Sequence, residues 1–163
     1  MIASPLQLPA PKELRDLFHD VLAKDVALRP GPPFAVSDFY PASIASYVDD
    51  TLTVRAVVAL DLPLSAFAGA AVALLPGASA TSAIQLGAVS GALAEGVNEI
   101  CSAMTSLFSS ATSRPLRLYA AHVAGSPLPA DARMRTQVLG RRQDVFVDVA
   151  GYGTGRLAVV LVP

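Results

Sequence analysis

The chain has 163 residues, of which 53% are hydrophobic and 15% are charged, and its formal net charge is −1. This length suits one domain with its own core, and so apolar a composition argues against disorder over most of the chain. A nearly neutral chain is not built for non-specific binding to nucleic acid. The single cysteine, Cys101, excludes an internal disulfide framework and is typical of a reducing compartment.

The mean hydropathy of +0.50 raises the question of a membrane segment, because residues 62–94 carry no charge. Pro76-Gly77 divides this stretch, and polar residues interrupt its second half. Neither part therefore supplies the roughly 20 consecutive apolar residues of a spanning helix. The N-terminus also lacks the basic and apolar regions of a secretory signal. We expect a cytoplasmic protein that does not contact a membrane.

Residues 1–11 contain three prolines and no periodic pattern, which predicts a flexible N-terminal tail. Residues 12–163 are expected to form a single domain, because no linker or low-complexity segment divides them. The domain begins with a predicted helix over residues 12–24, where apolar residues recur at helical spacing.

Strands are predicted next over residues 43–48 and 51–60, joined by a turn at Asp49-Asp50. Residues 64–75 are predicted to form a short apolar helix, and residues 80–111 one long amphipathic helix. The remaining predicted strands cover residues 116–123, 134–139, 143–149 and 156–162. This order favours an α+β fold in which an antiparallel sheet packs against the long helix and shorter helices.

The predicted long helix has two contrasting faces. Its large apolar side chains fall on one stripe, which is expected to be core: Leu86, Val89, Leu93, Val97, Ile100, Met104 and Leu107. The opposite face carries carboxylates and an amide among small residues: Gly91, Glu95, Asn98, Glu99 and Ser102. Glycine inside a helix costs about 1 kcal/mol relative to alanine. The small residues either make room for another molecule or let the helix pack within the chain.

Glu95 and Asn98 project from the same face about one turn apart. A carboxylate can pair with a lysine. A carboxamide both donates and accepts hydrogen bonds, so it can orient a water molecule without acting as a base. This combination suits phosphoryl hydrolysis, in which positioning and electrostatics do most of the catalytic work. Neither residue can hold a Mg²⁺ ion alone.

The segment LGAVSGALAEGVNEI (residues 86–100) resembles the CheC/CheX/FliY family of response-regulator phosphatases. The Glu-x-x-Asn pair of that family stands here as Glu95-Gly96-Val97-Asn98, and the order of elements is similar along nearly the whole chain. The resemblance implies a CheC-like fold. It also implies a phosphatase that hydrolyses the phospho-aspartate of a receiver domain in chemotaxis or two-component signalling.

The resemblance also assigns roles. Glu95 would pair with a lysine of the phosphorylated receiver, and Asn98 would orient the attacking water. Gly91, Glu99 and Ser102 would contact the partner, Mg²⁺ would be carried by the receiver, and the chain would need no cofactor of its own. Residues 64–75 lack the Glu and Asn of a second site, so the match is to the single-site, CheX-like type, which is commonly a homodimer.

Two alternatives remain open at this point. In the first, the chain is a CheX-like module that binds a receiver domain or dimerises without useful turnover, since Gly91 and Glu99 depart from the family pattern. Alternatively, the chain is an unrelated α+β binding domain whose polar helix face packs internally.

Other patterns point to structure. His19, His122 and Cys101 are not clustered in the sequence, so no metal site is expected. The glycine-rich residues 151–156 precede a strand-like run and not a helix, which favours a hairpin over a phosphate loop. From residue 113 onward the chain has three acidic residues and seven arginines. These arginines form either a basic rim or the solvated edges of strands.

Overall fold

The computed structural model describes residues 6–108 and 115–163 of the chain. In chain order its elements are α1 (Pro11–Leu22), β1 (Val26–Pro30), β2 (Ala42–Val48), β3 (Val54–Asp61), α2 (Leu62–Val72), α3 (Gly77–Leu86), α4 (Gly91–Ala103), a short 3₁₀ helix η1 (Met104–Phe108), β4 (Arg117–His122), α5 (Ala130–Arg135), β5 (Arg141–Val149) and β6 (Gly153–Leu161). The strands form one antiparallel sheet in the order β1-β5-β6-β3-β2-β4. The predicted α+β class with an antiparallel sheet is confirmed.

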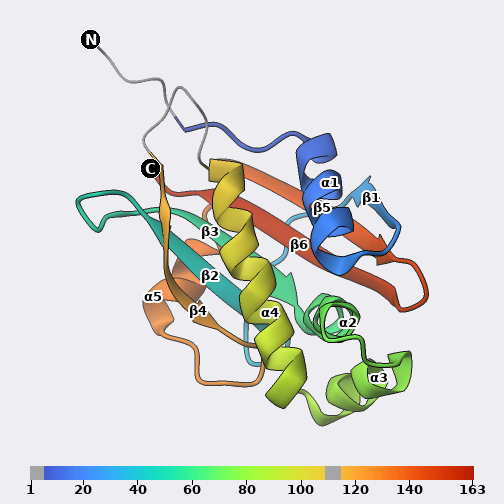
Figure 1. Cartoon of the computed structure of the whole chain (residues 1–163). Helices are drawn as coiled ribbons and strands as arrows, with labels where there is room; N and C mark the ends of the chain where they lie inside the picture. Colours follow the sequence, from blue (N-terminus) through green and yellow to red (C-terminus); the bar gives the residue numbers. More distant parts are fainter. Residues whose placement is uncertain (1–5, 109–114) are drawn as a thin grey trace.

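The sheet is covered on both faces. Helices α1, α2 and α4 lie across one face (Figure 1) and enclose the larger part of the core. Residues around Phe34 and Val36, together with Ala132 of α5, cover a smaller cluster on the other face. Strands β2 and β3 are therefore almost entirely buried, which explains their nearly continuous apolar sequence.

Two hairpins organise this sheet. The predicted strands at residues 43–48 and 51–60 are confirmed as β2 and β3, with a turn that extends to Thr53. The carboxylate of Asp49 fixes that turn by accepting hydrogen bonds from the backbone N–H groups of Thr51 and Thr53, at 2.9 and 3.1 Å. The glycine-rich segment forms the β5–β6 hairpin, in which Gly151 has a φ of 82°. The hairpin interpretation of residues 151–156 is confirmed.

The prediction of one helix over residues 80–111 is wrong in its extent. The segment forms α3, α4 and η1, with a break at residues 87–90, and residues 109–111 lie outside the described part. Gly87 ends α3 with a φ of 77°, and Gly91 begins α4 with a φ of 57°. These left-handed conformations are accessible to glycine and interrupt a regular helix. As a consequence Leu86, predicted as core, is 82% exposed.

One further strand prediction is wrong, and one strand was not predicted. Residues 134–139 were expected to form a strand, but Met134 lies in α5 and the chain then turns without joining the sheet. Asp131 in the first turn of α5 and Arg135 in its last turn form an ion pair at 3.3 Å, a charge order that favours a helix. Strand β1 was not predicted, because it is a short edge strand in which only Val26 is buried.

The N-terminal region consists of helix α1 and a preceding segment that packs against the core. The predicted helix over residues 12–24 is confirmed as α1, which begins one residue earlier, at Pro11. Of the expected tail, residues 6–10 are described, and Leu6 and Leu8 lie half-buried against the core. None of the described helices has both the length and the apolarity to cross a membrane.

Helix α4 is fixed by close contact with α2. A Cβ atom built on Gly96 would lie 2.5 Å from the carbonyl oxygen of Gly69, and one built on Gly69 would lie 2.6 Å from the carbonyl oxygen of Leu93. Only glycine permits this approach of two backbones. The space at Gly96 is thus occupied by the chain's own α2, whereas Gly91 is exposed. This contact fixes the position of α4 relative to α2.

Candidate functional site

Helix α4 separates its buried and exposed residues cleanly. Leu93, Val97 and Ile100 are buried beneath it, as the helical stripe predicts. The five residues singled out from the sequence, Gly91, Glu95, Asn98, Glu99 and Ser102, are all exposed. The structure therefore places the predicted site residues together on one outward face of a rigid helix.

Glu95 and Asn98 are available to another molecule. Among the described residues neither side chain makes a hydrogen bond or an ion pair. Their surroundings are small, since Gly91, Ala92 and Ser102 are exposed beside them. The interpretation in which this face packs internally is wrong, because the face is open to solvent. A flat partner surface can approach the two functional groups without displacing long side chains.

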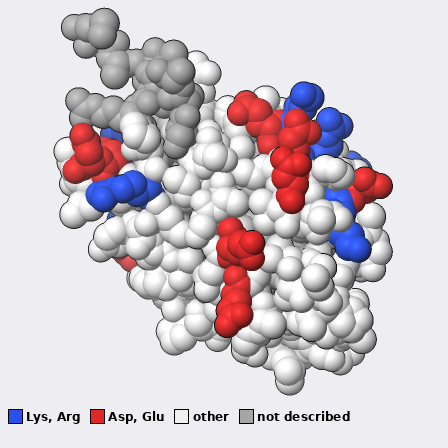
Figure 2. All heavy atoms as spheres, in the orientation of Figure 1, with Lys and Arg blue, Asp and Glu red and all other residues white. Residues whose placement is uncertain are grey.

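The exposed face of α4 carries only negative charges. Glu95 and Glu99 stand four residues apart, so they are neighbours on the helix surface. Neither has a cationic partner among the described residues. Figure 2 shows acidic side chains over α4 within a broad surface that otherwise carries little charge. Asn98 thus lies in a negative local field that favours a cationic group on any binding partner.

A residue that the sequence did not single out anchors the C-terminal end of α4. The hydroxyl of Tyr47, on β2, donates a hydrogen bond of 2.5 Å to the carbonyl oxygen of Cys101. Its ring packs against Phe108, with ring centroids 4.9 Å apart. This bond satisfies one of the helix carbonyls that lack an intrahelical partner. Sequence analysis offers little signal for it, because a tyrosine in an apolar strand looks like ordinary core.

Burial determines the protonation of both groups. It raises the pKa of Tyr47, and it raises the pKa of Cys101 to about 12. The thiol therefore stays protonated at neutral pH and is a poor nucleophile. Cys101 supports α4 from below and does not contribute chemistry to the exposed face.

The described part of the chain contains no group of three or more histidine, cysteine or acidic side chains placed to hold a metal ion. His19 is on α1, where its Nδ1 lies 2.9 Å from the carbonyl oxygen of Lys24, and His122 is on β4. The arrangement on α4 supplies a carboxylate and an amide.

Helix α2 does not carry a second pair of glutamate and asparagine. Helix α2 has no glutamate or asparagine and is buried along most of its length. The carboxylate of Asp61 caps it by accepting the N–H of Leu64 at 2.9 Å, and it also accepts the hydroxyl of Tyr40 at 2.7 Å. Helix α2 is a structural support for α4.

No protein-family model and no curated protein sequence matches the chain. Solved structures do match. The FliM chain of the FliM–SpeE complex from H. pylori aligns with a TM-score of 0.53 and 8% identity over 92% of this chain and 80% of that one. The FliM middle domain from H. pylori gives a TM-score of 0.50 and 8% identity over 92% and 83% of the two chains. Thermotoga maritima FliY gives 0.47 and 11% over 90% and 80%.

At these identities the FliM structures establish the fold alone. The chain has the CheC-like α+β fold of the FliM middle domain. The expected fold is therefore confirmed, whereas the single-site, CheX-like assignment stays a prediction.

Proposed function

We propose that the chain is a CheX-like phosphatase that hydrolyses the phospho-aspartate of a response-regulator receiver domain. One observation carries the proposal: Glu95 and Asn98 are exposed together on the outward face of α4 and have no partner among the described residues. The CheC-like fold supports it, because it is the fold that the Glu-x-x-Asn resemblance implies.

In this proposal Glu95 selects and aligns the partner. Its carboxylate forms an ion pair with the ammonium group of a receiver lysine, since this chain supplies no cation beside it among the described residues. This ion pair then holds the phosphorylated aspartate of the partner over the small residues around Gly91 and Ala92. Mg²⁺ would be carried by the receiver and would there supply charge neutralisation for the phosphoryl oxygens.

Asn98 positions the nucleophile. Its side-chain amide hydrogen-bonds a water molecule in line with the bond between phosphorus and the aspartate oxygen. The water oxygen bonds to phosphorus, the bond to the aspartate oxygen breaks, and free carboxylate and inorganic phosphate result. An amide is not a base, so its contribution is orientation. The close contact of α4 with α2 fixes the helix that carries this amide.

A second candidate is a CheX-like module that binds a receiver domain without useful turnover. Glu99 favours it, because a second unpaired carboxylate beside Asn98 repels the phosphoryl oxygens. One FliM structure of the same fold was solved in complex with SpeE, which shows that this fold also serves in protein–protein complexes. The homodimer implied by the resemblance and the cytoplasmic location expected from the sequence also remain predictions.

Phosphate release from a panel of phosphorylated receiver domains of the host tests the proposal. The wild-type chain is expected to accelerate release from at least one receiver, and Asn98→Ala to abolish the acceleration. Gln85→Ala and Asp20→Ala are matched controls, because both remove an exposed amide or carboxylate away from the α4 face. Binding without acceleration identifies the interaction module. Absence of both binding and acceleration contradicts the two candidates.

A further inference from the structure

We propose that a cavity beside α5 binds a small organic anion, one carboxylate or phosphoryl group on a compact apolar body, through the guanidinium of Arg133. The cavity measures about 490 Å³ and lies between residues 37–41, residues 125–128 and Gly87. None of the five residues of the α4 face lines it, so this proposal is independent of the phosphatase.

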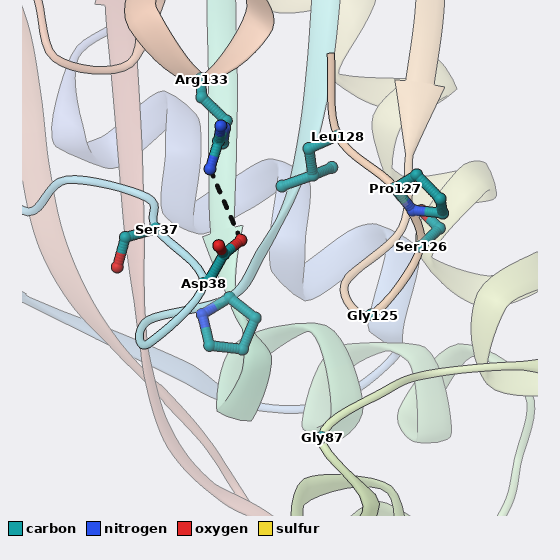
Figure 3. Close-up of a pocket in the computed structure, with 9 residues that line it drawn as sticks. Ser37, Asp38, Gly87, Gly125, Ser126, Pro127, Leu128 and Arg133 are labelled. Carbon is teal, nitrogen blue, oxygen red and sulfur yellow. Dashed lines mark ion pairs between the residues drawn. The ribbon is translucent and has the colours of Figure 1, made fainter. Parts of the chain in front are cut away.

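Arg133 has hydrogen-bonding capacity that the protein leaves unused. The only interaction of its side chain within the described residues is an ion pair in which Nη1 lies 3.5 Å from the carboxylate of Asp38 (Figure 3). That separation is long for a charge-assisted hydrogen bond. Its Nε is shielded from solvent and has no hydrogen-bond partner. Buried unsatisfied donors are rare and call for an explanation.

Two other partly buried arginines of this chain make more contacts than Arg133 does. Arg142 donates to both carboxylate oxygens of Asp144 at 2.8 and 2.9 Å, and also to the carbonyl oxygen of Thr136 at 2.9 Å. Arg156 lies over the ring of Phe34, 4.9 Å from its centroid, and donates to a loop carbonyl at 2.7 Å. Arg133, at 35% side-chain exposure, is neither solvated like a surface arginine nor satisfied like these two.

The lining matches an anion that carries an apolar body. Leu128, Pro41 and Pro127 supply apolar wall, and the volume falls in the range of small-molecule sites. Figure 3 shows the side chains of Arg133 and Leu128 reaching into the same space. The terminal Nη1 and Nη2 groups of a guanidinium can bind a carboxylate or phosphoryl group through two parallel hydrogen bonds.

The cavity is largely formed in advance. The N–H of Val89 donates to the carbonyl oxygen of Ala124 at 3.0 Å, and both the N–H and the hydroxyl of Ser126 donate to Val123, at 3.1 and 2.6 Å. These bonds hold the wall around Gly125, so little ordering entropy is lost when a ligand enters.

Asp38 is the group that the ligand must displace. Its side chain is 93% exposed, so it can swing into solvent when a competing anion takes the guanidinium. Removal of this carboxylate should therefore strengthen anion binding, whereas a site built for cations would be weakened by the same change.

Titration of the full chain at constant ionic strength, followed by amide NMR shifts, tests the proposal with defined probes. Phenyl phosphate and benzoate carry both the anion and the apolar body, inorganic phosphate carries only the charge, and phenol only the ring. We expect saturable shifts with the first two at residues 37–41, 87 and 125–128, and binding at least about tenfold weaker with inorganic phosphate or phenol.

Four variants complete the test. Arg133→Gln is expected to weaken binding about tenfold or more, and Arg133→Lys to give an intermediate loss. Asp38→Asn is expected to tighten binding several-fold, about threefold to tenfold. Arg135→Gln is the matched control, because that arginine lies on the same helix but pairs with Asp131, and it should bind like the wild type. If Arg133→Gln does not fold, Asp38→Asn still decides the question.

The proposal is overturned if neither the wild type nor Asp38→Asn shows saturable shifts around the cavity. It is equally overturned if folded Arg133→Gln binds as tightly as the wild type, or if Asp38→Asn binds more weakly than the wild type.

Discussion

The backbones of Gly96 and Gly69 touch, so closely that a Cβ atom on Gly96 would lie 2.5 Å from the carbonyl oxygen of Gly69. This contact joins the helix that carries the candidate site to the buried helix that supports it. Gly96 lies between Glu95 and Asn98 in sequence but is buried, whereas its two polar neighbours face solvent. The buried contact at Gly96 therefore fixes the helix that exposes Glu95 and Asn98 to solvent.

Gly96→Ala should therefore lower the free energy of unfolding by about 2 kcal/mol or more, although alanine is the better helix former. The added methyl group meets a backbone carbonyl that cannot rotate away. Urea unfolding measures the effect, with Gly140→Ala as the control, because a Cβ there meets nothing within 4 Å. A neutral or stabilised Gly96→Ala protein would show that the two helices separate easily.

The buried Tyr47 and Cys101 predict how stability changes with pH. The pKa of Cys101 is raised from 9.0 to about 12, so the unfolded chain loses this proton at a lower pH than the folded chain. Its contribution is constant below about pH 9 and declines by up to about 1.4 kcal/mol per pH unit toward pH 12. The raised pKa of Tyr47 adds a decline in the same direction above about pH 10.

Equilibrium unfolding between pH 8 and 11 measures this slope. Cys101→Ala should flatten it between pH 9 and 10 whatever its effect at pH 8. Tyr47→Phe should cost about 1–2 kcal/mol at neutral pH, since it removes the hydrogen bond to the carbonyl oxygen of Cys101. An alkaline slope that both variants leave unchanged would mean that other groups control it.

The ion pair between Arg142 and Asp144 predicts a large loss on truncation. Its side chains are only 7% and 5% exposed, and the guanidinium also satisfies the carbonyl oxygens of Thr136 and Val138. Arg142→Ala should cost about 3–5 kcal/mol, because it leaves a buried carboxylate and two carbonyls without partners. Arg141→Ala is the neighbouring exposed control. Similar unfolding midpoints for the two variants would refute the importance of the buried pair.

Glu99 gives a prediction that rests on the proposed phosphatase. Glu99→Gln removes one of two negative charges beside Asn98 and keeps the shape of the side chain. We expect phosphate release from a responsive receiver to accelerate several-fold, about twofold to tenfold, with a smaller gain at high salt. Glu13→Gln, an exposed change on α1, should have no effect. Slower release in Glu99→Gln would instead assign Glu99 a positive role in docking.

The parts of the fold that sequence analysis predicted correctly are those governed by local periodicity. Leu93, Val97 and Ile100 follow the helical repeat and are buried, so spacing alone placed Glu95 and Asn98 on the opposite side of the helix. It left open whether that side is exposed. The largely apolar runs on either side of Asp49-Asp50 likewise located the β2–β3 hairpin.

The errors arose where a single residue or a distant partner decides. The sequence around Gly87 and Gly91 does not show that these glycines adopt left-handed conformations. One helix was therefore expected where two α-helices exist. Strand β1 is defined by its pairing with β5, more than one hundred residues away, which no local pattern contains. The cavity at Arg133 was invisible for the same reason, because its walls come from four separate segments.

The most direct test of the central proposal separates binding from turnover in one receiver domain that the wild-type chain dephosphorylates. The rate constant of phosphate release at saturation and the affinity for the phosphorylated receiver are measured for the wild type, Glu95→Ala and Asn98→Ala. The proposal predicts that Asn98→Ala lowers the rate constant by about a hundredfold or more with little change in affinity, whereas Glu95→Ala mainly weakens binding. Unchanged release by Asn98→Ala would contradict the assignment of Asn98 as the residue that orients the water.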